Sequence, residues 1–116
     1  MPRIGRNKVQ FFVDGQEWRA VFKHEHANGK PIVVEGDRGD MKLTHVTTCF
    51  LGQVGVQGAL SAGEARCSVR DAYDWRKGIK LSFERSLEVR GITRELDRVR
   101  HGKFMAEFFK EMRDRG

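Results

Sequence analysis

The sequence predicts an α+β domain, in which a small, mainly antiparallel sheet of about four strands precedes two C-terminal helices. An Asp14-Gly15 pair between two alternating apolar runs indicates an N-terminal hairpin. A run rich in β-branched residues, Leu43 to Leu51, begins a second strand pair. Apolar residues at spacings of three and four then indicate helix. We expect the helices to cover one sheet face and to leave the other partly open.

The length and composition are typical of one globular domain. The chain has 116 residues, of which 39% are hydrophobic and 33% charged. Residues 1–7 are expected to form a flexible basic arm that carries Arg3 and Arg6. Because no apolar run reaches the roughly 18 residues of a membrane span, and the start lacks the apolar stretch of a secretory signal, we expect a cytoplasmic location and no membrane partner.

The N-terminal hairpin is the most sharply specified element. A two-residue turn at Asp14-Gly15 pairs Phe11 with Trp18 and Val9 with Ala20. These side chains form an apolar face together with Val13 and Phe22. The opposite face is basic and contains one aromatic ring; it consists of Arg6, Lys8, Gln10, Phe12, Glu17, Arg19, Val21 and Lys23.

Glycines punctuate the middle of the chain. Residues 27–42 are expected to form a long loop with room for a short strand at Ile32 to Val34. After the strand from Leu43 to Leu51, a glycine-rich connector leads to a returning antiparallel strand, Gly63 to Val69. A phosphate-binding loop must lead into a helix N-terminus, and this connector leads into a strand. We therefore expect no nucleotide loop here.

The first helix is expected to begin at a capping box of Ser68 and Asp71. One apolar stripe then follows at helical spacing, formed by Ala72, Trp75, Ile79, Phe83 and Leu87. This stripe assigns Trp75 to the core. Gly78 predicts either a break in the helix or a close backbone contact.

The second helix is expected to follow Arg90-Gly91, with Thr93 as its cap and a kink or split at Gly102. Ile92, Leu96 and Val99 would share its first apolar face. After Gly102 the apolar arc is wide and consists of Phe104, Met105, Phe108, Phe109 and Met112. We expect part of this arc to be exposed and to meet a partner protein or a second copy of the chain.

Neither metal binding nor catalysis has a strong signature. His24 and His26 with Cys49 and Cys67 are the one candidate zinc set, but no Cys-x-x-Cys spacing accompanies them. We expect both cysteines to be reduced and metal-free, with Cys67 buried under the first helix. His45 and Cys49 are four residues apart on one strand, about 13 Å, too far for a catalytic pair. We expect no cofactor and no enzymatic activity.

Part of the chain resembles a family of small bacteriophage-encoded proteins of uncharacterised function. The matching residues are Thr47, Thr48, Cys49, Gly63, Ala65, Cys67, Ser68, Asp71, Tyr73, Lys77, Gly78, Lys80, Arg85 and Leu87. They span residues 43–90, where the chain has Gly78-Ile79 in place of the family's usual Gly-Arg. The resemblance implies a phage accessory protein acting inside a bacterium, and it implies no particular activity.

The charge pattern favours a polyanionic partner. The net charge is +6, and the basic residues concentrate toward both ends of the chain. The expected nucleic-acid contacts are Arg3, Arg6, Lys8, Arg19, Lys23, Arg70, Tyr73, Arg76, Lys77 and Lys80. The predicted function is therefore non-catalytic binding of nucleic acid, DNA or RNA. The alternative is a protein that docks on a host bacterial protein through the apolar arc of the last helix.

Overall fold

A computed structural model describes residues 8–27, 29–36, 39–57, 60–70, 72 and 74–114. The predicted arm at residues 1–7, including Arg3 and Arg6, lies outside this set, as does Tyr73. The elements are β1 Lys8–Val13, β2 Gln16–His26, β3 Ile32–Gly36, β4 Gly39–Gln53, β5 Ser61–Ser68, α1 Trp75–Val89 and α2 Arg98–Asp114.

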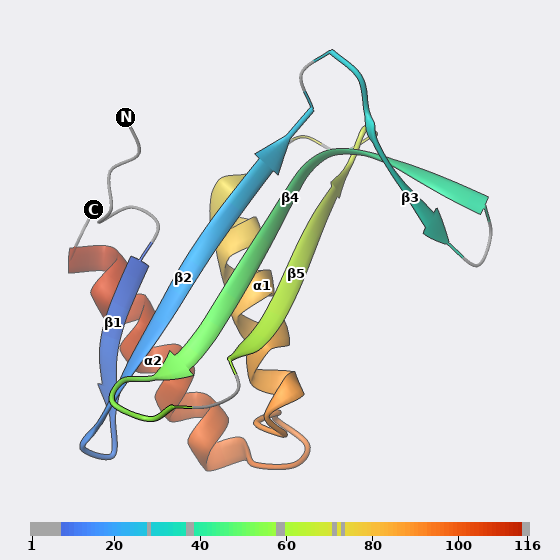
Figure 1. The fold of residues 1–116 in the computed structure, drawn as a ribbon. Helices are drawn as coiled ribbons and strands as arrows, with labels where there is room; N and C mark the ends of the chain where they lie inside the picture. The colour runs from blue at the N-terminus through green and yellow to red at the C-terminus, as the bar shows by residue number, and fades with distance from the viewer. Residues whose placement is uncertain are drawn as a thin grey trace.

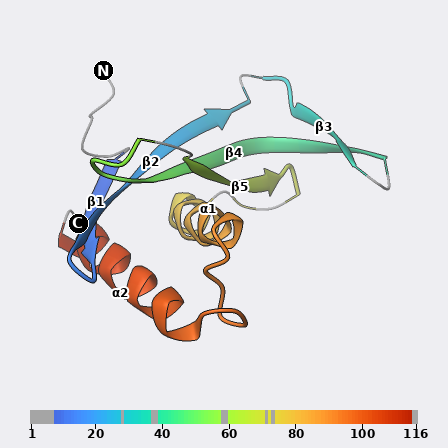
Figure 2. The ribbon, with the colours of Figure 1, turned by 60° about the horizontal axis from the view of Figure 1, so that its bottom comes forward.

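The fold is α+β, as the sequence predicts: one five-stranded antiparallel sheet is followed by two helices (Figure 1). β4 is the central strand, since it pairs with β2, β3 and β5. Both helices lie on the same face of the sheet, and the other face is open (Figure 2).

The N-terminal hairpin has the predicted register. Phe11 pairs with Trp18 and Val9 with Ala20. Asp14 and Gly15 both have positive φ, 51° and 80°, which matches the twist that a two-residue hairpin turn requires. The predicted apolar face is buried under the helices.

The short strand predicted at Ile32 to Val34 is confirmed as part of β3, but the long loop expected around it is wrong, because most of residues 27–42 form a second hairpin. β3 pairs with the first part of β4, from Ile32 opposite Leu43 to Gly36 opposite Gly39. β2 pairs with one edge of β4 and ends at His26, whereas β5 pairs with the opposite edge as far as Leu43. β3 therefore pairs with β4 on the same edge as β2, beyond the end of β2. This second hairpin extends past the helices (Figure 2).

An aromatic cluster joins the helices to the sheet. Phe83 of α1 stacks on Phe108 of α2 with ring centroids 4.0 Å apart. Phe11 of β1 meets both rings edge-on, and Phe104 meets Trp18 at 4.9 Å. Ring pairs of this kind stabilise a core beyond the area that they bury.

Gly63 sets how closely α1 approaches the sheet. A Cβ atom on Gly63 would overlap the Ser82 carbonyl oxygen and the Ser86 amide nitrogen of α1. Both serines are fully buried, and their hydroxyls donate to carbonyls one turn earlier in the helix. The helix backbone therefore rests directly on β5 at this glycine.

The predicted capping box is wrong, and α1 begins at Trp75. Asp74 is the N-cap, and its carboxylate accepts from the amides of Arg76 and Lys77. The Ser68 hydroxyl instead accepts from the Arg70 amide in a turn after β5. Because the helix starts later, Ala72 lies outside it, in an exposed position.

The end of α1 is as expected, but α2 starts later than predicted. Gly91 has φ 75°, and the amides of Gly91 and Ile92 close the helix on Glu88 and Leu87. Thr93 accepts from the Leu96 amide in a turn, and Asp97 precedes α2 and accepts from Arg100. The predicted apolar face is wrong apart from Ile92, which is buried, since Leu96 and Val99 are exposed. The helix also runs unbroken through Gly102.

The apolar arc on α2, part of which was expected to be exposed, is largely buried. Phe104 and Phe108 are fully buried against the sheet and α1. Met105, Phe109 and Met112 are half-buried and pack against the same core. The apolar arc is wide because one side of α2 packs on the β1–β2 hairpin and another side packs on α1. The arc therefore leaves little apolar surface exposed to a partner.

Candidate nucleic-acid interface

The predicted cations separate onto the two faces of the molecule. Lys8, Arg19 and Lys23 alternate with the buried residues of the hairpin, so they lie on the open sheet face. Four others lie at or shortly before the start of α1: Arg70 in the turn after β5, and Arg76, Lys77 and Lys80 on the helix; these four are the helix-start cations. The predicted contacts that the structure describes therefore do not form one surface, because the cations of the hairpin lie on the open face and those of α1 lie on the helix side.

The helix-start cations lie close to the capped N-terminus of α1. The first turn of α1 contains no acidic residue, and the carboxylate of the N-cap, Asp74, is the acidic group beside it. The partial positive charge of a helix N-terminus attracts anions. The ion pairs found among the described residues are Lys23–Glu25, Glu64–Arg66 and Asp14–Lys103, which include none of the four. All four side chains are exposed.

Trp75 is 48% exposed, contrary to the predicted place in the core. One turn later on the same stripe, Ile79 is only 2% exposed. The Arg76 guanidinium lies over the Trp75 ring, 5.6 Å from its centroid. The indole therefore forms an aromatic surface within the helix-start cations.

A cleft of about 400 Å³ lies between the start of α1 and the sheet. This helix-start cleft is lined by His45, Thr47, Ala65, Arg66, Cys67, Ala72, Asp74, Lys77, Gly78 and Leu81. Gly78 makes a close contact and not a break: a Cβ atom there would lie 3.0 Å from the Thr47 hydroxyl oxygen. Lys77 thus belongs both to the cleft and to the helix-start cations.

Three histidines lie at the same end of the sheet. His26 pairs with His45, which pairs with Cys67, and the His26 and His45 rings are 6.1 Å apart. His24 contacts the Thr47 hydroxyl at 3.2 Å, and partial burial lowers the pKa of its imidazole. In the part of the chain that the structure describes, no three His, Cys, Asp or Glu side chains are grouped closely enough to hold a metal ion.

The two cysteines occupy different environments. Cys49 pairs with Gly63 and is fully buried beneath α1, where burial raises the pKa of its thiol to about 12 despite a hydrogen bond with Ser86. Cys67 is half-buried and lines the helix-start cleft together with residues of α1, so the expected burial of this cysteine is wrong. They form no disulfide.

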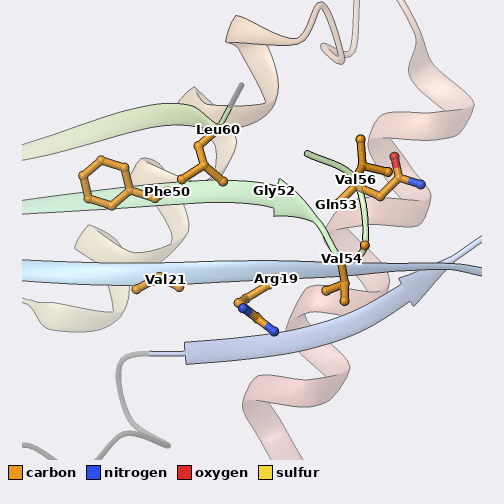
Figure 3. A pocket seen from close by; sticks show the side chains of 9 residues that line it. Arg19, Val21, Phe50, Gly52, Gln53, Val54, Val56 and Leu60 are labelled. Carbon is orange, nitrogen blue, oxygen red and sulfur yellow. The ribbon is translucent and has the colours of Figure 1, made fainter. Parts of the chain in front are cut away.

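The open sheet face carries an apolar groove of about 460 Å³. Figure 3 shows its lining side chains, which come from β2, β4 and the connector to β5. Val21 and Phe50 are directly opposed across β2 and β4, and Arg19 lies at one side. Leu60 closes over Gly52, which has no Cβ atom to obstruct it.

No protein family, curated protein or solved structure matched the chain in these comparisons. The phage resemblance of residues 43–90 therefore stays a prediction. Among the described residues, no helix is both long and apolar enough to cross a membrane.

Sequence patterns could not locate two features of these surfaces. The exposure of Trp75 could not be predicted, because Trp75 lies at helical spacing from Ile79 and therefore fits the predicted core stripe. The groove was hidden because it forms only when the connector folds back over Phe50.

Proposed function

We propose that the protein binds nucleic acid without catalysing a reaction on it, through the helix-start cations and Trp75. The observation that carries this proposal is a half-exposed tryptophan close to four exposed cations at the start of α1, where Asp74 is the one acidic residue of the cap and first turn. Nucleic-acid-binding surfaces combine cations for phosphates with aromatic rings for bases. The phage resemblance adds a setting, the cytoplasm of an infected bacterium.

Most of the binding free energy in such an interface comes from phosphates. Each cation that contacts a phosphate releases counterions, so affinity falls as salt rises. Such contacts carry little information about base sequence. We therefore expect affinity that depends strongly on ionic strength and weakly on sequence.

The test is a salt series of binding to random-sequence DNA and RNA. Arg70→Ala/Lys77→Ala should weaken binding and lower the slope of log K against log salt by about 0.9 per lost duplex contact. Both side chains are exposed, so the melting temperature should hardly change. Arg94→Ala/Arg98→Ala removes the same charge from exposed positions before and at the start of α2, and it is the matched control.

Equal losses in the two double variants would mean that net charge alone attracts the polyanion, and the helix-start interface would be wrong. An absence of binding by the parent protein at low salt would overturn the nucleic-acid proposal altogether.

A second candidate function is docking on a host protein, and the groove on the open face is the observation that favours it. Its lining combines the apolar side chains of Val21, Phe50 and Leu60 with Arg19 at one side, and Phe12 on the same sheet face is 60% exposed. Patches of this type mark protein interaction sites. This surface replaces the α2 arc, whose main aromatic rings are buried.

A further inference from the structure

We infer that the protein selects single-stranded over double-stranded nucleic acid, by stacking an unpaired base on Trp75. This inference rests on the proposed function and adds whether the bound nucleic acid is single-stranded or double-stranded. Three features carry it: the exposure of the indole, the position of the Arg76 guanidinium, and the adjoining cleft.

The indole is left uncovered by the way α1 lies on the sheet. Gly78 contacts Thr47, and Ser82 and Ser86 contact Gly63, so the helix start extends toward the sheet end that carries His45. The cleft there contains the half-buried His45 and Cys67, whereas buried core residues surround Ile79 and Phe83. Trp75 lies outside the hydrophobic core cluster, and about half of its surface remains in water.

The Arg76 guanidinium extends this aromatic surface. It lies over the indole at 5.6 Å and is itself exposed. Nucleobases stack on indole rings and on guanidinium planes, and every base has a face that can do so. The pair therefore offers a flat, cationic platform that does not depend on base identity.

Such a platform distinguishes single strands from duplexes. In a duplex the faces of internal bases are covered by their neighbours, so an indole reaches a base face only at an end or by unstacking. An unpaired strand presents its bases freely. Phosphate contacts, in contrast, are available in both forms.

The helix-start cleft leaves room for the nucleotides next to the base that stacks on Trp75. It opens on the side of the first turn where Lys77 lies, and its volume of about 400 Å³ falls within the range of small-molecule sites, roughly 300–1,000 Å³. Lys77 lines this cleft, so a phosphate held by its ammonium group would place the adjacent nucleotide at the cleft mouth.

The experiment compares a 12-nucleotide oligothymidylate with a 12-base-pair duplex at matched salt. The parent protein should bind the single strand more tightly. Its tryptophan fluorescence should be quenched by the single strand, because the other tryptophan, Trp18, is only 4% exposed. Trp75→Leu should weaken single-strand binding by about 5- to 150-fold, the range for one stacked base, and leave duplex binding unchanged.

Trp75→Phe is the matched control, since it keeps an aromatic face and should retain most of the preference. Melting temperatures of both variants show whether the fold is intact. Equal binding of the two DNAs, or equal loss of both in Trp75→Leu, would overturn the single-strand inference while leaving the proposed function in place. If the parent binds neither DNA nor the corresponding single-stranded and duplex RNA, the proposed function itself is wrong.

Discussion

Arg90, the C-cap residue of α1, connects the end of this helix to strands β4 and β5. Its guanidinium donates from Nε to the Ser61 hydroxyl at 2.7 Å and from Nη2 to the Leu51 carbonyl at 2.9 Å. It also lies over the Trp18 ring, 5.2 Å from the centroid. Desolvation and, to a smaller extent, the nearby Arg100 lower the pKa of this guanidinium. Arg90 therefore has a structural role, and it should not be counted among the cations that contact a ligand.

Cys49 should make the protein sensitive to alkaline pH. Its thiol has a pKa of about 12 in the fold, against 9.0 for an ordinary cysteine, because burial disfavours the thiolate. The folded state therefore retains a proton that the unfolded chain releases. The resulting stabilisation is complete below about pH 9 and is lost as pH rises toward 12.

Urea unfolding at pH 8 and pH 10.5 measures this effect. The parent should lose about 2 kcal/mol more free energy of unfolding over that interval than Cys49→Ala, which has no thiol to titrate. Alkylation of the folded protein at pH 8 is the independent check: Cys67 should react and Cys49 should not. Equal pH dependence in the two proteins would show that the Cys49 thiol is not protected.

At the scale of elements, turns and helix ends that are determined by a few neighbouring residues could be predicted from the sequence. The β1–β2 hairpin follows from Asp14-Gly15 and the alternation around it, and the end of α1 follows from Gly91. The start of α1 was not predictable because Ser68 and Asp74 are both good caps, and the turn after β5 decides between them. The second hairpin was missed because the predicted strand began at Leu43, which left residues 39–42, the part of β4 that pairs with β3, in the expected loop. The predicted contact residues stay a prediction, and the sequence could not show their division between two faces, since only the fold separates the two groups of cations.

The hairpin register gives a prediction about stability. Trp18 packs against Phe104 of α2 and beneath the Arg90 guanidinium, so Trp18→Ala should cost about 3–5 kcal/mol. Thermal or urea unfolding measures this loss. Phe12→Ala is the matched control, because Phe12 lies in the same hairpin on the open face and should change stability little. A Trp18→Ala variant that melts within a few degrees of the parent would contradict the role assigned to this ring.

At the scale of the whole molecule, the sheet divides two surfaces of different character. The helix side carries the helix-start cations and Trp75, and the open side carries the apolar groove with Lys8, Arg19 and Lys23 around it. Two of the three ion pairs between described residues, Lys23–Glu25 and Glu64–Arg66, also lie on the open side. Acidic partners therefore offset part of the positive charge there.

This division predicts which cations control nucleic-acid affinity. Arg19→Ala/Lys23→Ala should leave the salt slope near that of the parent, although it removes as much charge as Arg70→Ala/Lys77→Ala. The measurement is the same salt series with random-sequence DNA. If the Arg19 and Lys23 variant shows the larger loss of slope, the nucleic acid lies across the open sheet face and Phe12 becomes its aromatic contact.

The contact of α2 with β1 has a consequence for synthesis. Phe11 and Trp18 are translated well before Phe104 and Phe108, the rings of α2 that cover them. The aromatic face of the nascent hairpin therefore stays uncovered until α2 has been translated. During that interval the face is a site for chaperones or for self-association. Truncation before α2 would leave the nascent chain in this vulnerable state permanently.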